Sequence, residues 1–177
     1  MVARETIDRL EGQDARGVAN FVLDQFDVDR FQISNLKLNK LLFFAHGFFR
    51  SRFGRRLIRN HFEAWENGPV IRVVFDAFKQ NGRSPIRNRA EIFDYVEGRA
   101  LKAELLGLSV DEQTYLHSVI EYYVRYDAGQ LVGLTHRPGT PWHRARVTAH
   151  DSRLRDRIPD EWIDNYFVEN FGGRTAN

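Results

Sequence analysis

Apolar side chains recur at intervals of three to four residues along most of the chain, a spacing that places them on one face of an α-helix. The first such segment follows Asp14, a residue type that caps helices. Its apolar side chains are Val18, Phe21, Val22 and Phe26. The second segment lies between Ser34 and Gly54 and is apolar on all sides at residues 41–45. We therefore expect this second helix to be the central, most buried one.

The residues that follow predict a short β-hairpin and then another helix. Residues 55–65 form an extended stretch with a polar turn near Asn60, which is typical of a hairpin. Pro69 suits the first position of a helix, because its fixed φ matches helical backbone and its missing N–H is not needed there. This helix would end at Asn81-Gly82.

Capping signals divide the second half of the chain into further helices. Ser109 with Glu112 three residues later forms a capping box. The helix that it opens has an apolar seam of Leu116, Val119, Ile120, Tyr123 and Val124. Three more helices open at Asp127, at Thr140-Pro141 and at Ile158-Pro159.

The sum of these signals is a mainly α fold, a single-domain bundle of about seven helices with a small β-hairpin insert. Residues 83–100 are the least regular part, with turn signals at both ends and one short element at 90–96. We expect a polar leader at residues 1–14, the helical domain at 15–171 and a flexible tail at 172–177.

Composition narrows the possible chemistry. The chain has no cysteine, which removes disulfides, thiolate nucleophiles and cysteine-ligated zinc and suits a reducing cytoplasm. Its longest apolar run, residues 41–45, is far shorter than a membrane span, and the N-terminal residues lack the apolar core of a signal peptide. We therefore expect a cytoplasmic protein that does not enter a membrane.

The basic residues are almost all arginine, 22 against four lysines, and the formal net charge is only +2. Arginines cluster at residues 50–59, 83–89 and 143–157, where they could grip phosphates. No known nucleic-acid-binding motif accompanies them, and neighbouring acids suggest a self-paired surface. Binding to DNA, as an autoregulator of its own operon, stays open as an alternative.

No catalytic motif is present, although acid and base side chains are available. The six histidines form no His-Glu-x-x-His frame, and the phosphate-binding and serine-nucleophile motifs are absent. A hydrolase site built from Glu63, Glu66, His136 and His143 is the best enzymatic hypothesis. Structural readings are simpler: a buried His46 bonded to a backbone carbonyl, and a cationic His136 that caps a helix end. We expect no catalytic residue, no metal and no cofactor.

Five short strings in a fixed order resemble a known family. They are VANFVL at 18–23, LKLNKLLFFAHGFF at 36–49, FEAWENGPV at 62–70, LVGLTH at 131–136 and TPWHRAR at 140–146. Together they resemble the Panacea-domain family, which includes SocA-like antitoxins and GepA-like phage-associated proteins. The matching motif residues are Leu38, Lys40, Leu41, Leu42, Ala64, Trp65, Gly68, Pro69, Val70, Leu134, Thr135, His136, Pro141 and Trp142. The chain departs from the family pattern at Phe43 and Asn67, where tyrosine and an aromatic residue are common.

The resemblance implies a non-catalytic antitoxin that binds a toxin encoded beside it and masks it. In the SocA-like branch the protein is instead an adaptor that delivers its toxin to a Clp-type protease. Such a function needs an exposed patch with aromatic and arginine anchors, because these residues dominate binding energy at interfaces. The candidates are Phe49, Arg50, Arg52, Phe53, Arg55, Arg56, Tyr122 and Tyr126. Core packing is the competing interpretation of the phenylalanines.

Overall fold

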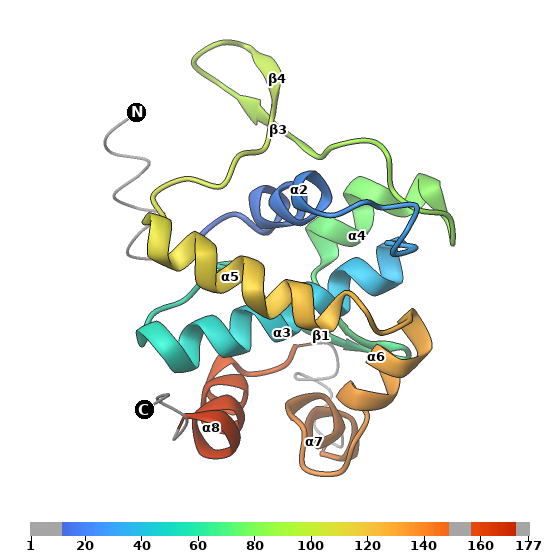
Figure 1. Cartoon of the computed structure of the whole chain (residues 1–177), viewed down its shortest axis with the longest axis vertical. Helices are drawn as coiled ribbons and strands as arrows, with labels where there is room; N and C mark the ends of the chain where they lie inside the picture. The colour runs from blue at the N-terminus through green and yellow to red at the C-terminus, as the bar shows by residue number, and fades with distance from the viewer. Residues whose placement is uncertain (1–11, 149–156, 173–177) are drawn as a thin grey trace.

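The computed structural model describes residues 12–148 and 157–172, and these form a mainly α domain with two small hairpins (Figure 1). The helices are α2 (Ala15–Gln25), α3 (Asn35–Phe53), α4 (Arg72–Phe78), α5 (Val110–Tyr123), α6 (Ala128–Thr135), α7 (Pro141–Val147) and α8 (Asp160–Phe171). A 3₁₀ turn, η1 (Lys79–Asn81), follows α4. The strands are β1 (Glu63–Trp65) with β2 (Gly68–Val70), and β3 (Glu91–Asp94) with β4 (Arg99–Lys102). The prediction of a helical bundle with a β-hairpin is confirmed.

Helix α3 is the centre of the fold, as predicted. It contacts α2, α4, α5, α6 and α8, and α5 lies across its front (Figure 1). Phe43 and Phe49 are almost fully buried on it, and burying one such side chain stabilises a fold by roughly 1.5–3 kcal/mol. A helix covered on every side needs the all-round apolar sequence found at residues 41–45.

The helix starts predicted from side-chain caps at Asp14, Ser34 and Ser109 are confirmed because they depend on local capping. Asp14 accepts a hydrogen bond from the backbone N–H of Arg16, and Ser34 accepts one from Lys37. Ser109 and Glu112 form the expected capping box at the start of α5. These side chains satisfy N–H groups that have no partner within their own helix. Gly54 ends α3 in the left-handed conformation, with φ +67°.

The first hairpin is displaced from its predicted position. Its strands pair Glu63 with Val70 and Trp65 with Gly68, so the turn falls at residues 66–67 rather than near Asn60. Asn60 instead accepts a hydrogen bond from the N–H of Ala15. Pro69 lies within β2, and α4 begins only at Arg72, so the prediction that Pro69 opens a helix is wrong. A two-stranded hairpin has edges on both sides, where a proline without an N–H is tolerated.

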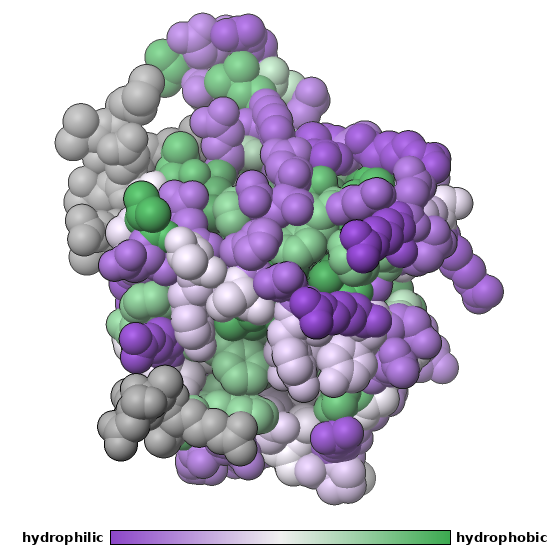
Figure 2. Space-filling model, viewed as in Figure 1, coloured by the Kyte–Doolittle hydropathy of each residue, from purple (hydrophilic) through white to green (hydrophobic). Residues whose placement is uncertain are grey.

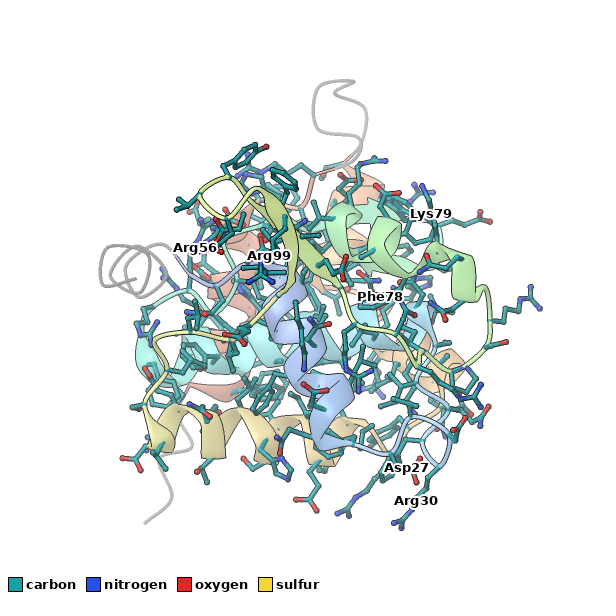
Figure 3. All side chains as sticks on the ribbon, turned by 90° about the horizontal axis from the view of Figure 1, so that it is seen from above. Asp27, Arg30, Arg56, Phe78, Lys79 and Arg99 are labelled. Carbon is teal, nitrogen blue, oxygen red and sulfur yellow. The ribbon has the colours of Figure 1, made fainter. Side chains whose placement is uncertain are left out.

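The second hairpin, β3–β4, occupies the region where we predicted only one short element. It projects from the body of the domain above α2 (Figures 1 and 3). The buried side chain of Asn20 holds its base by donating to the carbonyls of Ala90 and Ala103 and accepting from the N–H of Ala90. At its tip, the side chains of Tyr95 and Val96 are 89% and 94% exposed.

The chain ends lie mostly outside the described residues. Of the predicted leader, residues 12–14 are described, and Gln13 is buried: its backbone bonds to Leu57 and Arg59. Of the predicted tail, only Gly172 is described. Among the described residues, no helix is both long and apolar enough to cross a membrane.

Candidate functional site

The strings that carry the family resemblance converge in space around the β1–β2 hairpin. From α3, the amine of Lys40 donates to the carbonyl of Pro69 at 2.8 Å. Its neighbour Asn39 accepts a hydrogen bond from the N–H of Ile71, also at 2.8 Å. Two adjacent side chains of the central helix thus hold β2 and the chain just after it. We call the residues around this contact, from 39–40, 64–71 and 134–142, the motif cluster.

Gly68 allows the hairpin to approach α3 and α6 closely. A Cβ atom at this position would lie 2.6 Å from Cε of Lys40 and 2.7 Å from the hydroxyl of Thr135. Its backbone φ is +100°, a value that residues other than glycine adopt only with strain. Glycine is therefore required here for two independent reasons.

Trp142 and His136 close the motif cluster from the side of α6 and α7. The imidazole of His136 stacks on the indole of Trp142, with ring centroids 3.6 Å apart and planes 3° from parallel. The indole N–H of Trp142 donates to the carbonyl of Trp65 at 2.7 Å. The hydroxyl of Thr140 donates to the carbonyl of Thr135 at 2.6 Å. The bond from Trp142 to Trp65 joins strings that lie 77 positions apart in the sequence, and the bond from Thr140 to Thr135 links the end of α6 to the start of α7.

Burial controls the electrostatics of the cluster. Lys40 is fully buried without a carboxylate partner among the described residues, and burial lowers its pKa to about 7. Burial, assisted by the charges of Lys40 and Arg146, also lowers the pKa of His136. His136 is the C-terminal cap residue of α6, as predicted, but its lowered pKa disfavours the cationic form that we expected, and its ring stacks on Trp142.

The other histidine prediction is also corrected. His46 is buried, as expected, but its Nδ1 accepts a hydrogen bond from the N–H of Ile58 at 3.2 Å instead of donating to a carbonyl. Burial lowers its pKa to about 4, so the ring is neutral at ordinary pH. A neutral imidazole has one acceptor nitrogen, and here that nitrogen fixes the chain after α3.

The proposed hydrolase residues form no acid–base unit. The two carboxylate oxygens of Glu63 accept from Arg72 at 3.0 and 2.7 Å and from the indole of Trp65 at 2.6 Å. Glu66 is exposed in the turn, and neither carboxylate is hydrogen-bonded to His136 or His143. In the part of the chain that the structure describes, no group of three acidic or histidine side chains could hold a metal ion.

A groove between α3, α5 and α8 offers a different kind of surface, which we call the aromatic groove. It has a volume of about 420 Å³ and is lined by Phe48, Tyr115, Ser118, Val119, Tyr122, Tyr123 and Phe171. An apolar strip is visible there, between α5 and α8 (Figure 2). Tyr122 is 58% exposed, and large exposed aromatic side chains are typical of binding surfaces.

The predicted partner-binding residues divide into three groups. Phe49 is fully buried and so faces the core, not a partner. Three arginines of α3 and the chain just after it are held in ion pairs with helices α5 and α8: Arg50 with Asp164, Arg55 with Glu112 and Arg56 with Asp160. The remaining residues lie at or beside the aromatic groove: Arg52, Phe53, Tyr122 and Tyr126. Phe53 packs edge-on against Tyr115, and Tyr126 contacts the ring of Tyr122.

Several groove residues escaped the sequence prediction, although for one of them, Tyr115, the sequence contains a signal. Tyr115, Val119 and Tyr122 follow one another at intervals of four and three residues, which defines a stripe along one face of a helix, and Tyr126 lies just beyond the end of α5. Of these, Tyr122 and Tyr126 are among the predicted partner-binding residues and Val119 is part of the predicted core seam, so Tyr115 is the one that the prediction missed. Leu116 and Ile120 form the buried face of α5, and the tyrosine stripe lies next to it.

The arginine clusters offer little to nucleic acid. In the 83–89 stretch, Arg87 pairs with Asp29 and Arg89 with Asp24. Much of the 143–157 stretch lies outside the described residues. Arginines already paired with acids contribute less to phosphate binding than unpaired ones.

Comparison with known proteins gives the chain its family. The family described as "Antitoxin SocA-like, Panacea domain" matches residues 38–143. A curated relative, Antitoxin SocA of Caulobacter vibrioides (strain NA1000 / CB15N), is 41% identical over 133 residues, which cover 73% of this chain and 68% of the relative. The chain belongs to the SocA-like Panacea antitoxin family. No solved structure matches it significantly.

The span of the family match distinguishes the motif cluster from the aromatic groove. The SocA-like Panacea segment, residues 38–143, runs from α3 to the start of α7 and contains the hydrogen-bonded core of the motif cluster. The aromatic groove is only partly inside it, because Phe171 of α8 contributes one wall. The resemblance inferred from five short strings is thus confirmed, and those strings mark the packed unit more than the groove.

Proposed function

We propose that this protein is an antitoxin that neutralises a protein toxin by binding it directly, without catalysis. The observation that carries the proposal is the 41% identity to Antitoxin SocA over most of both chains. The structure supports it in two ways. The amine of Lys40 and the indole N–H of Trp142 in the motif cluster donate to backbone carbonyls, where they stabilise the fold, and an exposed aromatic groove is available to a partner.

The toxin is expected to be encoded by an adjacent gene and to act in the cytoplasm. The direct test is co-expression: each neighbouring reading frame is induced alone and together with this protein, and growth is measured. We expect one neighbour to arrest growth alone, to be tolerated in the presence of this protein, and to co-purify with it. If no neighbour is toxic and none co-purifies, the proposal is wrong.

The resemblance to the SocA-like branch suggests a second mode, delivery of the toxin to a Clp-type protease. The same strains distinguish the two modes. If this protein masks its toxin, the amount of toxin stays constant during rescue. If it acts as an adaptor, the toxin is depleted, and both depletion and rescue disappear in a strain without the protease.

The alternative function, binding to its own promoter as an autoregulator, needs a separate test. A mobility-shift assay with its own promoter fragment, at 50 and 200 mM salt, tests it. We expect no shift from this protein alone, because five arginines of the basic clusters are already held in ion pairs: Arg50, Arg55, Arg56, Arg87 and Arg89.

A further inference from the structure

The aromatic groove has the shape of a site for a helix. One wall is the tyrosine stripe of α5, the other is the end of α8 at Phe171, and Phe48 of α3 lies between them. The part of α5 that lines the groove, from Tyr115 to Tyr123, extends over roughly 12 Å, since each helical residue rises about 1.5 Å. A concave channel of this length, lined mainly by aromatic rings, matches about two turns of an amphipathic helix.

Of the three tyrosines that line the groove, Tyr115 and Tyr122 have hydroxyls with partners among the described residues. That of Tyr115 donates to the carbonyl of Phe48 at 3.5 Å, and that of Tyr126 bonds to the hydroxyl of Tyr122 at 3.3 Å. The rings therefore present apolar surface to a partner at a low cost of removing their hydroxyls from water.

The two ends of the groove are positively charged. Arg52 lies close enough to Tyr115, and Arg137 close enough to Tyr123 and Tyr126, for their charges to act on these side chains. Both arginines are exposed, and neither forms an ion pair with any residue that the structure describes. The nearby acids Glu112, Glu121 and Asp164 are paired with other arginines, and Glu169 of α8, which lines a neighbouring hollow together with Arg137, forms no ion pair with a described residue. The ends thus favour a partner that carries carboxylates.

We infer that the aromatic groove binds an amphipathic helix of the toxin about two turns long. The apolar face of this helix packs on Phe48, Tyr122 and Phe171, and acidic side chains at its two ends pair with Arg52 and Arg137. This inference rests on the proposed function, because it names the part of the toxin that the antitoxin recognises. A protein fits better than nucleic acid, because two isolated arginines on a chain of net charge +2 offer little to a phosphate backbone.

Photocrosslinking tests which surface meets the toxin. A photoreactive phenylalanine analogue replaces Tyr122 in one variant and Tyr95 in a matched control. Tyr95 is also an exposed tyrosine, 89% accessible, but it lies on the β3–β4 hairpin, away from the groove. In the complex with the toxin identified by co-expression, we expect a crosslink from position 122 and none from position 95. The crosslinked toxin peptide should be an amphipathic helix with acidic residues near both ends.

Other results would overturn the inference while leaving the proposed function intact. They are a crosslink from position 95 alone, a crosslink from 122 to a second copy of this chain or to nucleic acid, or a toxin peptide without acidic residues. Failure of the unmodified protein to bind or neutralise any neighbouring product would instead refute the proposed function.

Charge reversal tests the ends of the groove. We expect Arg52→Glu and Arg137→Glu each to raise the Kd for the toxin at least tenfold. Arg83→Glu is the matched control, because Arg83 is also exposed and has no ion pair among the described residues, but it lies in the loop after η1. An acid-to-arginine change at the crosslinked toxin residue should restore binding to Arg52→Glu or Arg137→Glu. Equal effects of all three reversals would contradict the inference.

Discussion

The motif cluster and the aromatic groove both contain large aromatic side chains, but these are more buried in the cluster and more exposed in the groove. In the motif cluster, Trp142 is 9% exposed, its indole N–H is bonded to a backbone carbonyl, and a histidine covers its ring. In the aromatic groove, Tyr122 is 58% exposed and its ring faces solvent. The short strings that identify the family therefore mark what holds the domain together. The surface suited to a partner lies on a neighbouring stripe. Substitutions in the two regions should separate stability from binding.

The largest loss of stability is expected at Gly68. Gly68→Ala combines backbone strain with a Cβ that clashes with Lys40 and Thr135, and we expect it to lower the free energy of unfolding by roughly 2–4 kcal/mol. Urea denaturation measures the change.

Gly98→Ala is its control. Gly98 also has a positive φ, +65°, but no atom lies within 4 Å of a Cβ placed there. We expect a cost of about 1 kcal/mol, from backbone strain alone. Equal costs at the two glycines would mean that the hairpin does not approach α3 and α6 as closely as described.

The buried Lys40 should make stability depend on pH. Its pKa is about 7 in the fold and near 10.5 in the unfolded chain. Between these values the unfolded chain binds a proton that the folded chain does not, so lowering the pH favours unfolding. The free energy of unfolding should therefore rise from pH 7 to pH 9, by at most about 1.4 kcal/mol per unit from this group, and this contribution should level off below pH 7.

Lys40→Met removes the titrating group and keeps most of the buried volume. Its free energy of unfolding, measured in urea at pH 7, 8 and 9, should lack this rise. Parallel pH profiles for the two proteins would show that Lys40 does not change its protonation on folding.

A smaller loss is expected at Trp142. Trp142→Phe removes the hydrogen bond to the carbonyl of Trp65, and we expect it to cost about 1–2 kcal/mol in the free energy of unfolding. Trp65→Phe should cost less, because Trp65 is only half-buried and its indole is bonded to the side chain of Glu63. Thermal unfolding of both variants ranks them, and the reverse order would show that Trp65 is the main support of the cluster.

The sequence revealed those features that depend on near neighbours. Asp14, Ser34 and Ser109 cap helices through bonds that span two or three residues, so the pattern alone locates them. Pro69 was misassigned because its local preference for a helix start takes no account of β1 or of Lys40, which is 29 residues away and bonded to its carbonyl. A contact between distant segments decided the conformation there.

Contacts between distant segments also limit what the sequence can predict about the candidate site. Phe48 and Phe49 are adjacent and chemically identical, yet Phe49 is buried and Phe48 lines the aromatic groove. The packing of α5 and α8 around α3 makes that difference, and no local pattern contains it. Arg52 and Arg55 also look equivalent in sequence, but Glu112 lies within reach of Arg55 alone.

The central claim is that the aromatic groove binds the toxin while the motif cluster maintains the fold. The most direct test is the variant Tyr122→Ala, for which the Kd for the toxin is measured by calorimetry and the free energy of unfolding in urea. We predict a Kd at least tenfold higher than that of the unmodified protein, because exposed interface tyrosines are frequent binding hot spots. The free energy of unfolding should change by less than about 0.5 kcal/mol. An unchanged Kd in a stably folded variant would contradict the account.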